Sequence, residues 1–350
     1  MFFSHPRRIT LPRPAGSARR WATPAAITAR GVRVTDIRRE TDDAVTLTLA
    51  TEDGRPLPFR AGQYLTHCFN IDGAEVRRAY SLSVAEGEPP ACTVKLLPGG
   101  LVSQYVVTRL KIGARYRVLG PSGDFVLTPG ERGPLVMLAA GSGITPIISL
   151  IETALRADPQ RRVRLLYINR DPARTLFDAR LRAAQARYPR FEWTPWYTAS
   201  AGRPDAARLA ELLQPEIDAQ IYLCGPQPLM DAATAGLRAA GVAAARIRRE
   251  RFIPAPRHQQ RPTAPVEIRF LRSGRTIVQR PGESILEAGL RAGLALPFSC
   301  TVGGCGHCRV RIRDGEVCLD EPNCLSADER AAGWTLACSA CALTPLTVDA

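Results

Sequence analysis

The stretch FSCTVGGCGHCRVRI, residues 298–312, places three cysteines within nine positions and three glycines beside them. Cys300, Cys305 and Cys308 form a C-x4-C-x2-C pattern, and Cys338 follows after 29 intervening residues. Glycine lets backbone amides approach closely, and two irons bridged by sulfide need four thiolates from a loop that wraps them. The spacing is that of plant-type [2Fe-2S] sites and predicts a cluster held by these four cysteines.

Zinc is the main alternative for such a cysteine set. Its usual paired C-x2-C ligands do not match a three-plus-one arrangement with a four-residue gap, so iron and sulfide are favoured. A Rieske site needs two histidines, and His307 is the only one in this loop. Cys318, Cys324 and Cys341 are spare thiols, because the spacing already closes with Cys338.

The chain has 350 residues, which predicts two or three domains that each bury a core. No apolar run approaches the length of a membrane span. Residues 1–29 are rich in arginine and proline and lack an apolar core, so we expect a basic tail and not a secretory signal; an organelle transit peptide is the alternative. Ten cysteines without an export signal indicate a reducing compartment, and we expect the cytoplasm.

The net charge of +14 raises the question of nucleic-acid binding. Lys95 and Lys111 are the only lysines, so arginine supplies almost all of the positive charge. From Ala264 onward arginines and acids nearly balance, and the charge therefore makes no single basic face. We do not expect a nucleic-acid partner.

The order of local patterns indicates three domains. Residues 30–130 alternate apolar and polar positions between Gly and Pro breaks, which is typical of an antiparallel β-barrel. Residues 131–252 alternate buried strands with helices, which predicts a doubly wound α/β domain with a parallel sheet. Residues 253–265 hold four prolines and are predicted to be a linker. Residues 266–350 begin with a hairpin and a helix that lead into the cysteine loop.

Four motifs outside the cysteine loop carry a family resemblance. They are RAYS at 78–81, GGLVS at 99–103, GSGITP at 141–146 and CGP at 224–226. From about residue 30 to 350, the chain resembles ferredoxin-NADP reductase-like flavoproteins with a C-terminal plant-type [2Fe-2S] domain, the type of phenylacetyl-CoA epoxidase reductase and other oxygenase reductase components. The resemblance implies an FAD-binding barrel, an NAD(P)-binding domain and an α+β ferredoxin domain of the β-grasp kind.

The resemblance assigns the flavin site to the barrel. It implies that Arg78 holds a flavin phosphate, Tyr80 packs on the isoalloxazine ring and Ser81 hydrogen-bonds near its reacting nitrogen. A guanidinium fork, a flat ring and a hydroxyl suit those tasks. FMN is the alternative to FAD, and an ordinary glycine turn is the alternative reading of residues 99–103. The further residues expected to bind the cofactor are Lys95, Gly99, Gly100, Val102 and Ser103.

The nicotinamide site is expected where a buried strand ends in Gly141-Ser-Gly143. Pro146 replaces the third glycine of the dinucleotide fingerprint, but a pyrophosphate can still rest on the helix that starts there. The resemblance implies that Thr145 lies beside the nicotinamide. It also implies that Cys224, Gly225 and Pro226 form the second nicotinamide loop and that Phe252 lies near the flavin. Cys224 as a core residue and Phe252 as a packing residue are the alternatives.

Two neighbouring residues bear on the choice between NADPH and NADH, and they favour different cofactors. A cation after the second strand suits the 2'-phosphate of NADPH, whereas an acid suits the free ribose hydroxyl of NADH. Arg170 is such a cation and Asp171 is such an acid. Arg170 slightly favours NADPH, and NADH stays open.

The three domains together predict an electron-transfer reductase. A nicotinamide gives up two electrons at once and a [2Fe-2S] cluster takes one, so a flavin must stand between them. We expect Tyr80, Ser81 and Thr145 beside the reacting atoms, and a terminal oxygenase, hydroxylase or desaturase as the acceptor. The alternatives are a reductase of a soluble ferredoxin or a hybrid-cluster protein, and a redox-sensing regulatory subunit without enzyme activity.

Overall fold

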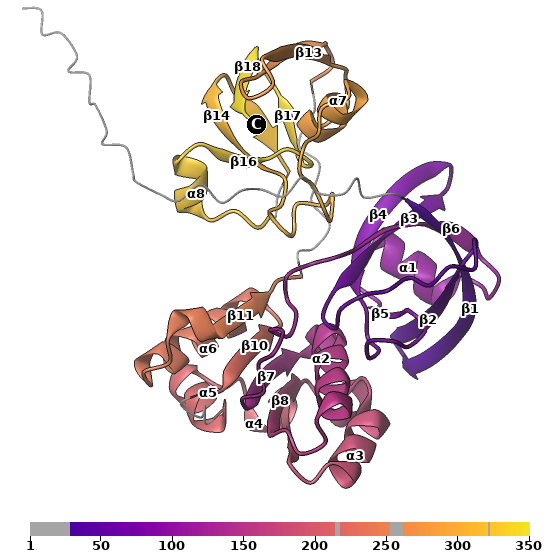
Figure 1. Cartoon of the computed structure of the whole chain (residues 1–350), viewed down its shortest axis with the longest axis vertical. Helices are drawn as coiled ribbons and strands as arrows, with labels where there is room; N and C mark the ends of the chain where they lie inside the picture. Colours follow the sequence, from indigo (N-terminus) through magenta and orange to yellow (C-terminus); the bar gives the residue numbers. More distant parts are fainter. Residues whose placement is uncertain (1–28, 214–217, 253–261, 321–322) are drawn as a thin grey trace, which may run out of the picture.

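The computed structural model describes residues 29–213, 218–252, 262–320 and 323–350. The predicted tail, 1–29, lies outside this part of the chain except for its last residue, and so does most of the predicted linker, 253–265. Figure 1 shows three bodies in the described residues: a curled sheet near the N-terminus, a layered α/β body, and a smaller C-terminal body beside the curled sheet. The predicted fold class is confirmed.

The first body is a six-stranded antiparallel sheet in the order β4-β3-β6-β1-β2-β5. Its edges meet at an isolated bridge between Leu82 and Cys92, which closes the sheet into a barrel. Helix α1 (Leu101–Thr108), which the alternating pattern did not predict, lies between the last two strands in sequence. The strands are β1 (Arg30–Thr41), β2 (Ala44–Thr51), β3 (Tyr64–Ile71), β4 (Ala74–Ser81), β5 (Ala91–Lys95) and β6 (Arg115–Ser122).

The barrel core contains a buried histidine. His67 on β3 is fully buried between Phe69, Tyr80 and Tyr116, and its Nδ1 lies 3.0 Å from the Tyr116 hydroxyl. Burial lowers its pKa to about 3, so the ring is neutral at ordinary pH. The histidine is a core residue of a strand.

The second body is a parallel sheet in the order β11-β10-β7-β8-β9 with helices on both faces (Figure 1). Alternate residues of β7 serve the two faces: Met137 packs with α2 and Leu138 with α5 and α6. A continuous apolar strand is expected in such a doubly covered sheet. The elements are β7 (Leu135–Ala140), α2 (Ile144–Ala157), β8 (Val163–Asn169), α3 (Asp178–Arg187), β9 (Phe191–Tyr197), α4 (Thr198–Ala201), α5 (Ala206–Leu213), β10 (Gln220–Cys224), α6 (Gln227–Ala239) and β11 (Ile247–Glu250).

The third body is a mixed five-stranded sheet in the order β13-β12-β18-β14-β16, with a separate pair formed by β15 and β17. Strands β12 and β18 run parallel, and helix α7 packs on the apolar side. Ser284 and Glu287 form a capping box that fixes the start of α7, as the sequence Glu-Ser-Ile-Leu-Glu allows. The elements are β12 (Val266–Phe270), β13 (Arg275–Gln279), α7 (Ile285–Arg291), β14 (Arg309–Asp314), β15 (Val317–Leu319), α8 (Ala327–Ala331), β16 (Trp334–Leu336), β17 (Ala340–Ala342) and β18 (Leu346–Asp349).

In the residues that the structure describes, no helix has the length and hydropathy needed to span a membrane.

The barrel and the α/β domain share one apolar core. Ala61 and Phe125 of the barrel belong to the same buried cluster as the face of β7 that packs on α2. The Phe125 and Tyr222 rings meet edge to face with centroids 5.3 Å apart, and the Tyr222 hydroxyl donates to the carbonyl of Val126 at 3.0 Å. The two domains are therefore held as one rigid frame.

We expect Phe125→Ala to lower the free energy of unfolding by about 3–5 kcal/mol, because it opens a cavity in this shared core. Ile112→Ala removes a side chain that is 60% exposed on the barrel and should cost less than about 0.5 kcal/mol. Urea unfolding followed by circular dichroism compares the two. Equal midpoints for the two variants would show that the shared core does not hold the domains together.

Candidate functional site

A groove of about 810 Å³ runs between the barrel and the α/β domain. It brings together residues that are far apart in sequence, from strand β4, the turn before α1, the β7–α2 turn and the loop after β10. The expected site residues that line it are Arg78, Tyr80, Ser81, Lys95, Gly100, Val102, Ser103, Gly141, Gly143, Thr145, Arg170, Gly225, Pro226 and Phe252.

Three expected residues do not line the groove. Gly99 occupies a left-handed turn with φ of +72° and open space around it. Pro146 is buried inside helix α2, and Cys224 is fully buried at the end of β10, as its reading as a small core residue suggested. Burial raises the pKa of the Cys224 thiol far above its ordinary value. Pro146 and Cys224 therefore lie behind the groove surface, whereas Gly99 is exposed outside the groove.

The barrel side of the groove is the end of strand β4. Tyr80 is half-buried and meets His67 edge to face at 5.4 Å, which fixes the plane of its ring. The Arg78 guanidinium donates to the carbonyl of Arg77 at 2.6 Å and has no carboxylate partner among the described residues. Ser81 is buried, with 3% exposed. A flat ring, a free cation and a hydroxyl therefore stand side by side at the groove.

The turn from Leu97 to Ser103 forms the next part of the wall. Ser103 Oγ accepts from the amide of Leu97 at 3.1 Å and donates to the carbonyl of Gly100 at 3.1 Å, which makes the turn rigid. A side chain at Gly100 would lie 2.6 Å from Ser103 Oγ, so the position requires glycine. Lys95 lies 3.5 Å from Asp43.

The α/β side is the β7–α2 turn. A side chain at Gly143 would lie 2.2 Å from the carbonyl oxygen of Cys224, so only glycine lets α2 start against the end of β10. Thr145 is buried, and its hydroxyl donates to the carbonyl of Ser142 at 3.0 Å. Helices α1 and α2 both begin at the groove without a capping side chain. Helix starts of this kind are suited to phosphate groups, but in α2 the amide of Ile144 already donates to the carbonyls of Gly141 and Ser142.

The far end of the groove is lined by arginines. Arg170, Arg174 and Arg203 line it together with Asn169 and Thr198. Asn169 is 6% exposed, and its Nδ2 has no hydrogen-bond partner among the described residues. A buried amide donor without a partner in a groove wall indicates that a polar ligand supplies the missing acceptor.

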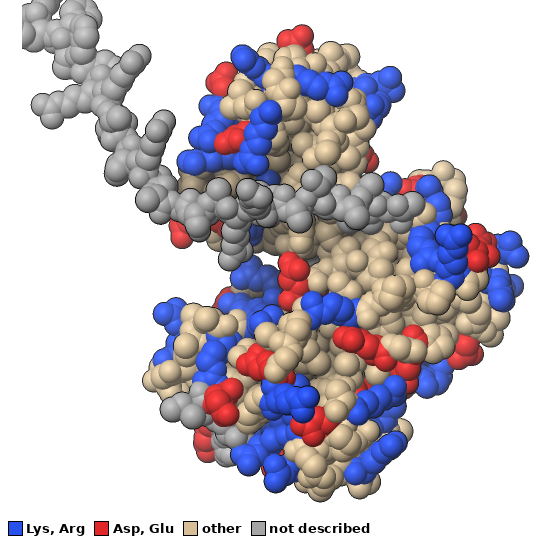
Figure 2. Space-filling model, viewed as in Figure 1, with Lys and Arg blue, Asp and Glu red and all other residues tan. Residues whose placement is uncertain are grey.

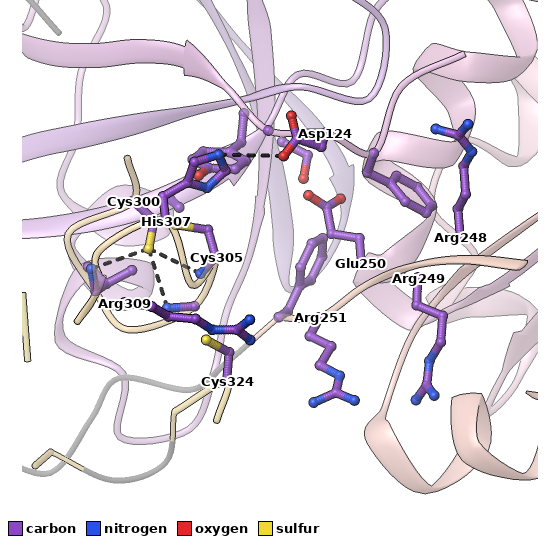
Figure 3. A pocket seen from close by; sticks show the side chains of 18 of the residues that line it. Asp124, Arg248, Arg249, Glu250, Arg251, Cys300, Cys305, His307, Arg309 and Cys324 are labelled. Carbon is purple, nitrogen blue, oxygen red and sulfur yellow. Dashed lines mark hydrogen bonds and ion pairs between the residues drawn. The ribbon is translucent and has the colours of Figure 1, made fainter. Parts of the chain in front are cut away.

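The cysteine loop lies at the edge of the ferredoxin-like domain that faces the barrel. The amides of Val302, Gly304 and Cys305 point at the sulfur of Cys300, with nitrogen–sulfur distances of 3.5, 3.3 and 3.4 Å (Figure 3). Gly303 and Gly306 adopt φ of +73° and +76°, which the sharp loop needs. Such a nest of amides stabilises negative charge on sulfur.

The four expected cysteines form two pairs. Cys300 is a hydrogen-bond neighbour of Cys305, and Cys308 of Cys338. The hydrogen bond with Cys300 lowers the pKa of Cys305 well below its ordinary value, and Cys308 acts likewise on Cys338. Across the described residues, no three His, Cys, Asp or Glu side chains converge on a single metal position. Two thiol pairs fit a cluster with two irons better than one zinc ion.

A cleft of about 840 Å³ lies where the three domains meet (Figure 3). One wall carries Cys300 and Cys305, and another carries Arg78 and Ser81. Arg78 and Ser81 also line the groove described above. The end of β4 thus forms a common wall between the groove and the cysteine loop.

Comparison with known families agrees with this arrangement. Residues 31–127 match the family of oxidoreductase FAD-binding domains, residues 137–235 that of oxidoreductase NAD-binding domains, and residues 268–343 that of 2Fe-2S iron-sulfur cluster binding domains. Each match falls on one of the three bodies of the fold.

Proteins with all three domains are similar over nearly the whole chain. A component of 1,2-phenylacetyl-CoA epoxidase from Escherichia coli is 35% identical over 349 residues, covering 92% of this chain and 96% of that protein. The ferredoxin reductase component of 3-ketosteroid-9-alpha-monooxygenase from Mycobacterium tuberculosis is 34% identical, covering 88% and 91%. The solved structure of phthalate dioxygenase reductase superposes with a TM-score of 0.69 at 26% identity, covering 92% and 98%.

The chain belongs to the family of iron-sulfur flavoprotein reductases. It is an NAD(P)H-dependent oxidoreductase whose cofactors are FAD, NAD(P)H and a [2Fe-2S] cluster. The expectations of a flavin, a nicotinamide and an iron-sulfur cluster are therefore confirmed.

One residue of the reductase site was not predicted. Glu250, at the end of β11, lies in the cleft with its Oε2 buried and without a hydrogen-bond partner among the described residues. It stands opposite Cys224 in the parallel pair of strands. Burial raises its pKa from 4.5 to about 8, so it is protonated at neutral pH. The only sequence signal is an acid directly before the end of the α/β domain.

A raised acid pKa in the folded state means that the fold binds this proton more tightly than the unfolded chain does. We expect Glu250→Gln to match the wild type in melting temperature at pH 4.5 and to become more stable than the wild type as the pH rises toward 8, because only the wild type must then take up a proton in order to fold. Melting curves at several pH values measure this. Glu211→Gln, at an exposed position of α5, is the control and should follow the wild type at every pH. A Glu250→Gln curve parallel to that of the wild type would contradict the buried proton.

Proposed function

We propose that this reductase is the electron-transfer component of a multicomponent oxygenase, hydroxylase or desaturase. It would take two electrons from NADPH and pass them singly to a terminal acceptor protein. The observation that supports this most is the common wall: Arg78 and Ser81 line both the groove and the cysteine cleft, so a flavin bound beside them lies next to the cysteines. The polar residues at that wall and the thiol pairs fit the cofactors of the family.

The chemistry divides between the bound groups and the chain. When bound, FAD supplies a centre that accepts two electrons as a hydride and a [2Fe-2S] cluster supplies one that carries single electrons, so oxidation of one NADPH delivers two electrons and releases one proton. The chain binds and orients these groups. It also decides which nicotinamide enters the groove.

The flavin-side roles follow from the groove geometry. Arg78 would hold a phosphate oxygen with its unpaired guanidinium, Tyr80 would pack on the flavin ring, and Ser81 would hydrogen-bond near the reacting nitrogen. The ring contact with His67 keeps the Tyr80 ring in the orientation that stacking needs. The residues that would hold the remainder of the dinucleotide are Lys95, Gly100, Val102 and Ser103, with Gly99 shaping the turn.

The nicotinamide would enter over the β7–α2 turn. The start of α2 and the glycines at 141 and 143 would take the pyrophosphate, and Thr145 would stand beside the nicotinamide ring. Gly225 and Pro226 would line the groove beside the nicotinamide ring. Phe252 would cover the flavin until the nicotinamide enters. Phe252 is 43% exposed, which leaves it free to move aside.

Cys300 and Cys305 would ligate one iron, and Cys308 and Cys338 the other, because they already lie as two pairs. Cys318, Cys324 and Cys341 would not ligate. The amides that point at the Cys300 sulfur would stabilise the negative charge of the thiolates.

The relatives favour an oxygenase as the acceptor. The similar proteins named above are components of an epoxidase, a monooxygenase and a phthalate dioxygenase. A soluble ferredoxin or a hybrid-cluster protein is the alternative acceptor, and rapid reduction of cytochrome c or ferricyanide would argue against a regulatory subunit without catalytic turnover. A pull-down with candidate oxygenase subunits distinguishes the acceptors.

We expect purified holoprotein to show flavin and iron-sulfur absorption bands that both bleach with NADPH. Cys305→Ser should keep the flavin bleaching but lose most of the iron and acid-labile sulfide, because one thiolate ligand is removed. Cys318→Ser replaces a buried spare thiol in the same domain and should keep the full iron content. Zinc instead of iron in the wild type, or full iron in Cys305→Ser, would refute the assignment.

The arginines at the far end of the groove favour NADPH over NADH. Arg170 and Arg203 line the groove there and have no carboxylate partner among the described residues. Asp171 does not line the groove, and its Oδ2 lies 3.7 Å from Arg174. The loop that carries Arg203 is held by hydrogen bonds from Ala199 to Arg170 and from Trp196 to Gly202. Two unpaired guanidinium groups on a fixed loop suit the 2'-phosphate.

Arg203→Ala should lower kcat/KM for NADPH at least tenfold and leave kcat/KM for NADH within about twofold, because a charge-assisted hydrogen bond of about 1.5–3 kcal/mol is lost only with the phosphate. Steady-state flavin reduction with both nicotinamides measures the ratio. Arg182→Ala, on the exposed side of α3, is the control. Equal losses for NADPH and NADH would place Arg203 at the adenine or pyrophosphate and not at the 2'-phosphate.

A further inference from the structure

We propose that Tyr64 is a positioning residue that fixes the cysteine loop of the ferredoxin domain against the flavin strand and thereby sets the rate of electron transfer to the cluster. The proposal rests on the proposed order of electron flow from the groove to the cysteines. The Tyr64 side chain on the barrel would be the contact that holds the flavin site and the cysteine loop together.

Tyr64 sits at the first position of β3, directly beside the flavin strand. Its backbone pairs with Ser81 on one side and with Ser122 on the other. Ser81 is the residue expected beside the reacting part of the flavin. The position of Tyr64 is therefore fixed relative to the strand that carries the flavin site.

The Tyr64 side chain reaches the other domain. Its hydroxyl lies 2.6 Å from Ser299 Oγ, across 235 positions of sequence, and Ser299 directly precedes the cysteine Cys300. Both side chains are buried, with 7% of Tyr64 and 5% of Ser299 exposed. The Cys305 thiol is a second hydrogen-bond neighbour of the same hydroxyl. One phenol thus links the flavin strand to the loop that carries three of the four expected ligands.

A second contact from the same strand supports the same loop. Thr66 is two residues further along β3, so its side chain points to the same face as that of Tyr64. Thr66 Oγ1 donates to the carbonyl of Cys300 at 3.4 Å, and Thr66 is 1% exposed. Because both contacts are buried, neither exchanges freely with water, and leaving one partner alone would be costly.

The barrel is shaped to hold the Tyr64 ring in place. A side chain at Gly123 would lie 3.1 Å from Tyr64 Cε1, so the ring packs directly on the Gly123 backbone, which has φ of +116°. The next residue, Asp124, lies 3.4 Å from His307 in the cysteine loop (Figure 3). That pair is exposed, with 89% of the Asp124 side chain in solvent, and contributes little. The buried phenol is the specific part of the contact.

Electron tunnelling falls steeply with the separation of the two centres, so a domain that is tethered but not fixed spends only part of its time in the productive position. Tethering gives the ferredoxin domain a high effective concentration near the flavin, and correct orientation of the domain further raises the rate of electron transfer. The Tyr64 hydroxyl acts on orientation. Its loss should slow transfer to the cluster without slowing transfer into the flavin.

The experiment compares wild-type, Tyr64→Phe and Tyr116→Phe holoproteins in anaerobic stopped flow with NADPH. In Tyr64→Phe the flavin band should be reduced at the wild-type rate, within about twofold, while the cluster band is reduced at least fivefold more slowly. Tyr116→Phe is the matched control, because its hydroxyl bonds to His67 inside the barrel and not to the ferredoxin domain. It should leave the cluster rate unchanged.

Two further measurements separate positioning from other causes. Hydrogen exchange should rise in residues 296–304 of Tyr64→Phe and stay unchanged in Tyr116→Phe. The midpoint potential of the cluster should stay near the wild-type value. A potential lowered enough to explain the slower rate would overturn the proposal. In a double-mutant cycle, adding Ser299→Ala to Tyr64→Phe should slow cluster reduction no further, since both remove the same hydrogen bond.

The outcomes distinguish this inference from the proposed function. If NADPH does not reduce the cluster in the wild type, the order of electron flow is wrong and the role of Tyr64 falls with it. If the wild type reduces its cluster but Tyr64→Phe does so equally fast, or if flavin and cluster slow together, the positioning role is refuted while the reductase function stands.

Discussion

The end of strand β4 is the constraint on which the site depends, because it must serve a flavin on one side and a cysteine loop on the other. Arg78 and Ser81 border both the groove and the cleft. Strand β4 suits this task, since its backbone pairs with β3 along its whole length and neighbouring side chains point to opposite faces. Transfer between the two sites then depends on how firmly the third domain is held against this strand.

The two domain boundaries of the reductase are built differently. Between the barrel and the α/β domain the contact is a shared apolar core around Phe125 and Tyr222. Between the barrel and the ferredoxin domain the hydrogen bonds and ion pair come from Tyr64, Thr66 and Asp124. Burial of apolar area makes a permanent joint, whereas a few polar contacts make one that is specific in geometry but modest in energy.

That difference suits the chemistry of the two steps. Hydride transfer needs the nicotinamide and flavin sites fixed to within fractions of an ångström, so the frame that holds them must be rigid. Single-electron transfer tolerates more separation, and the cysteine loop must also come near an acceptor protein. Figure 2 shows the ferredoxin domain standing apart from the α/β domain, with the cleft open between them. A polar and therefore weaker contact suits a domain that must exchange electrons with both the flavin domain and an acceptor protein.

Local patterns in the sequence were sufficient for the fold class and for much of the site. The cysteine spacing, the RAYS stretch and the Gly-Ser-Gly turn each carry their chemistry within a few residues, so they can be read before the chain is folded. Helix α1 was missed because its eight residues lie within a run of alternating strands. Glu250 and Tyr64 were missed for another reason: their roles come from burial and from partners on distant segments, which no local pattern encodes.

The arginines show most clearly what the sequence conceals. In a chain whose positive charge is almost entirely arginine, Arg203 looks no different from the many on the surface, and Arg170 is marked only by its place after the second strand. The structure separates them by their partners. Arg164 and Arg182 lie within 3.0 Å and 2.7 Å of carboxylates, whereas Arg170 and Arg203 line the groove with none among the described residues. A cation without a carboxylate partner in a concave wall attracts an anionic ligand, and the dianionic 2'-phosphate on the ribose of NADPH is such a ligand.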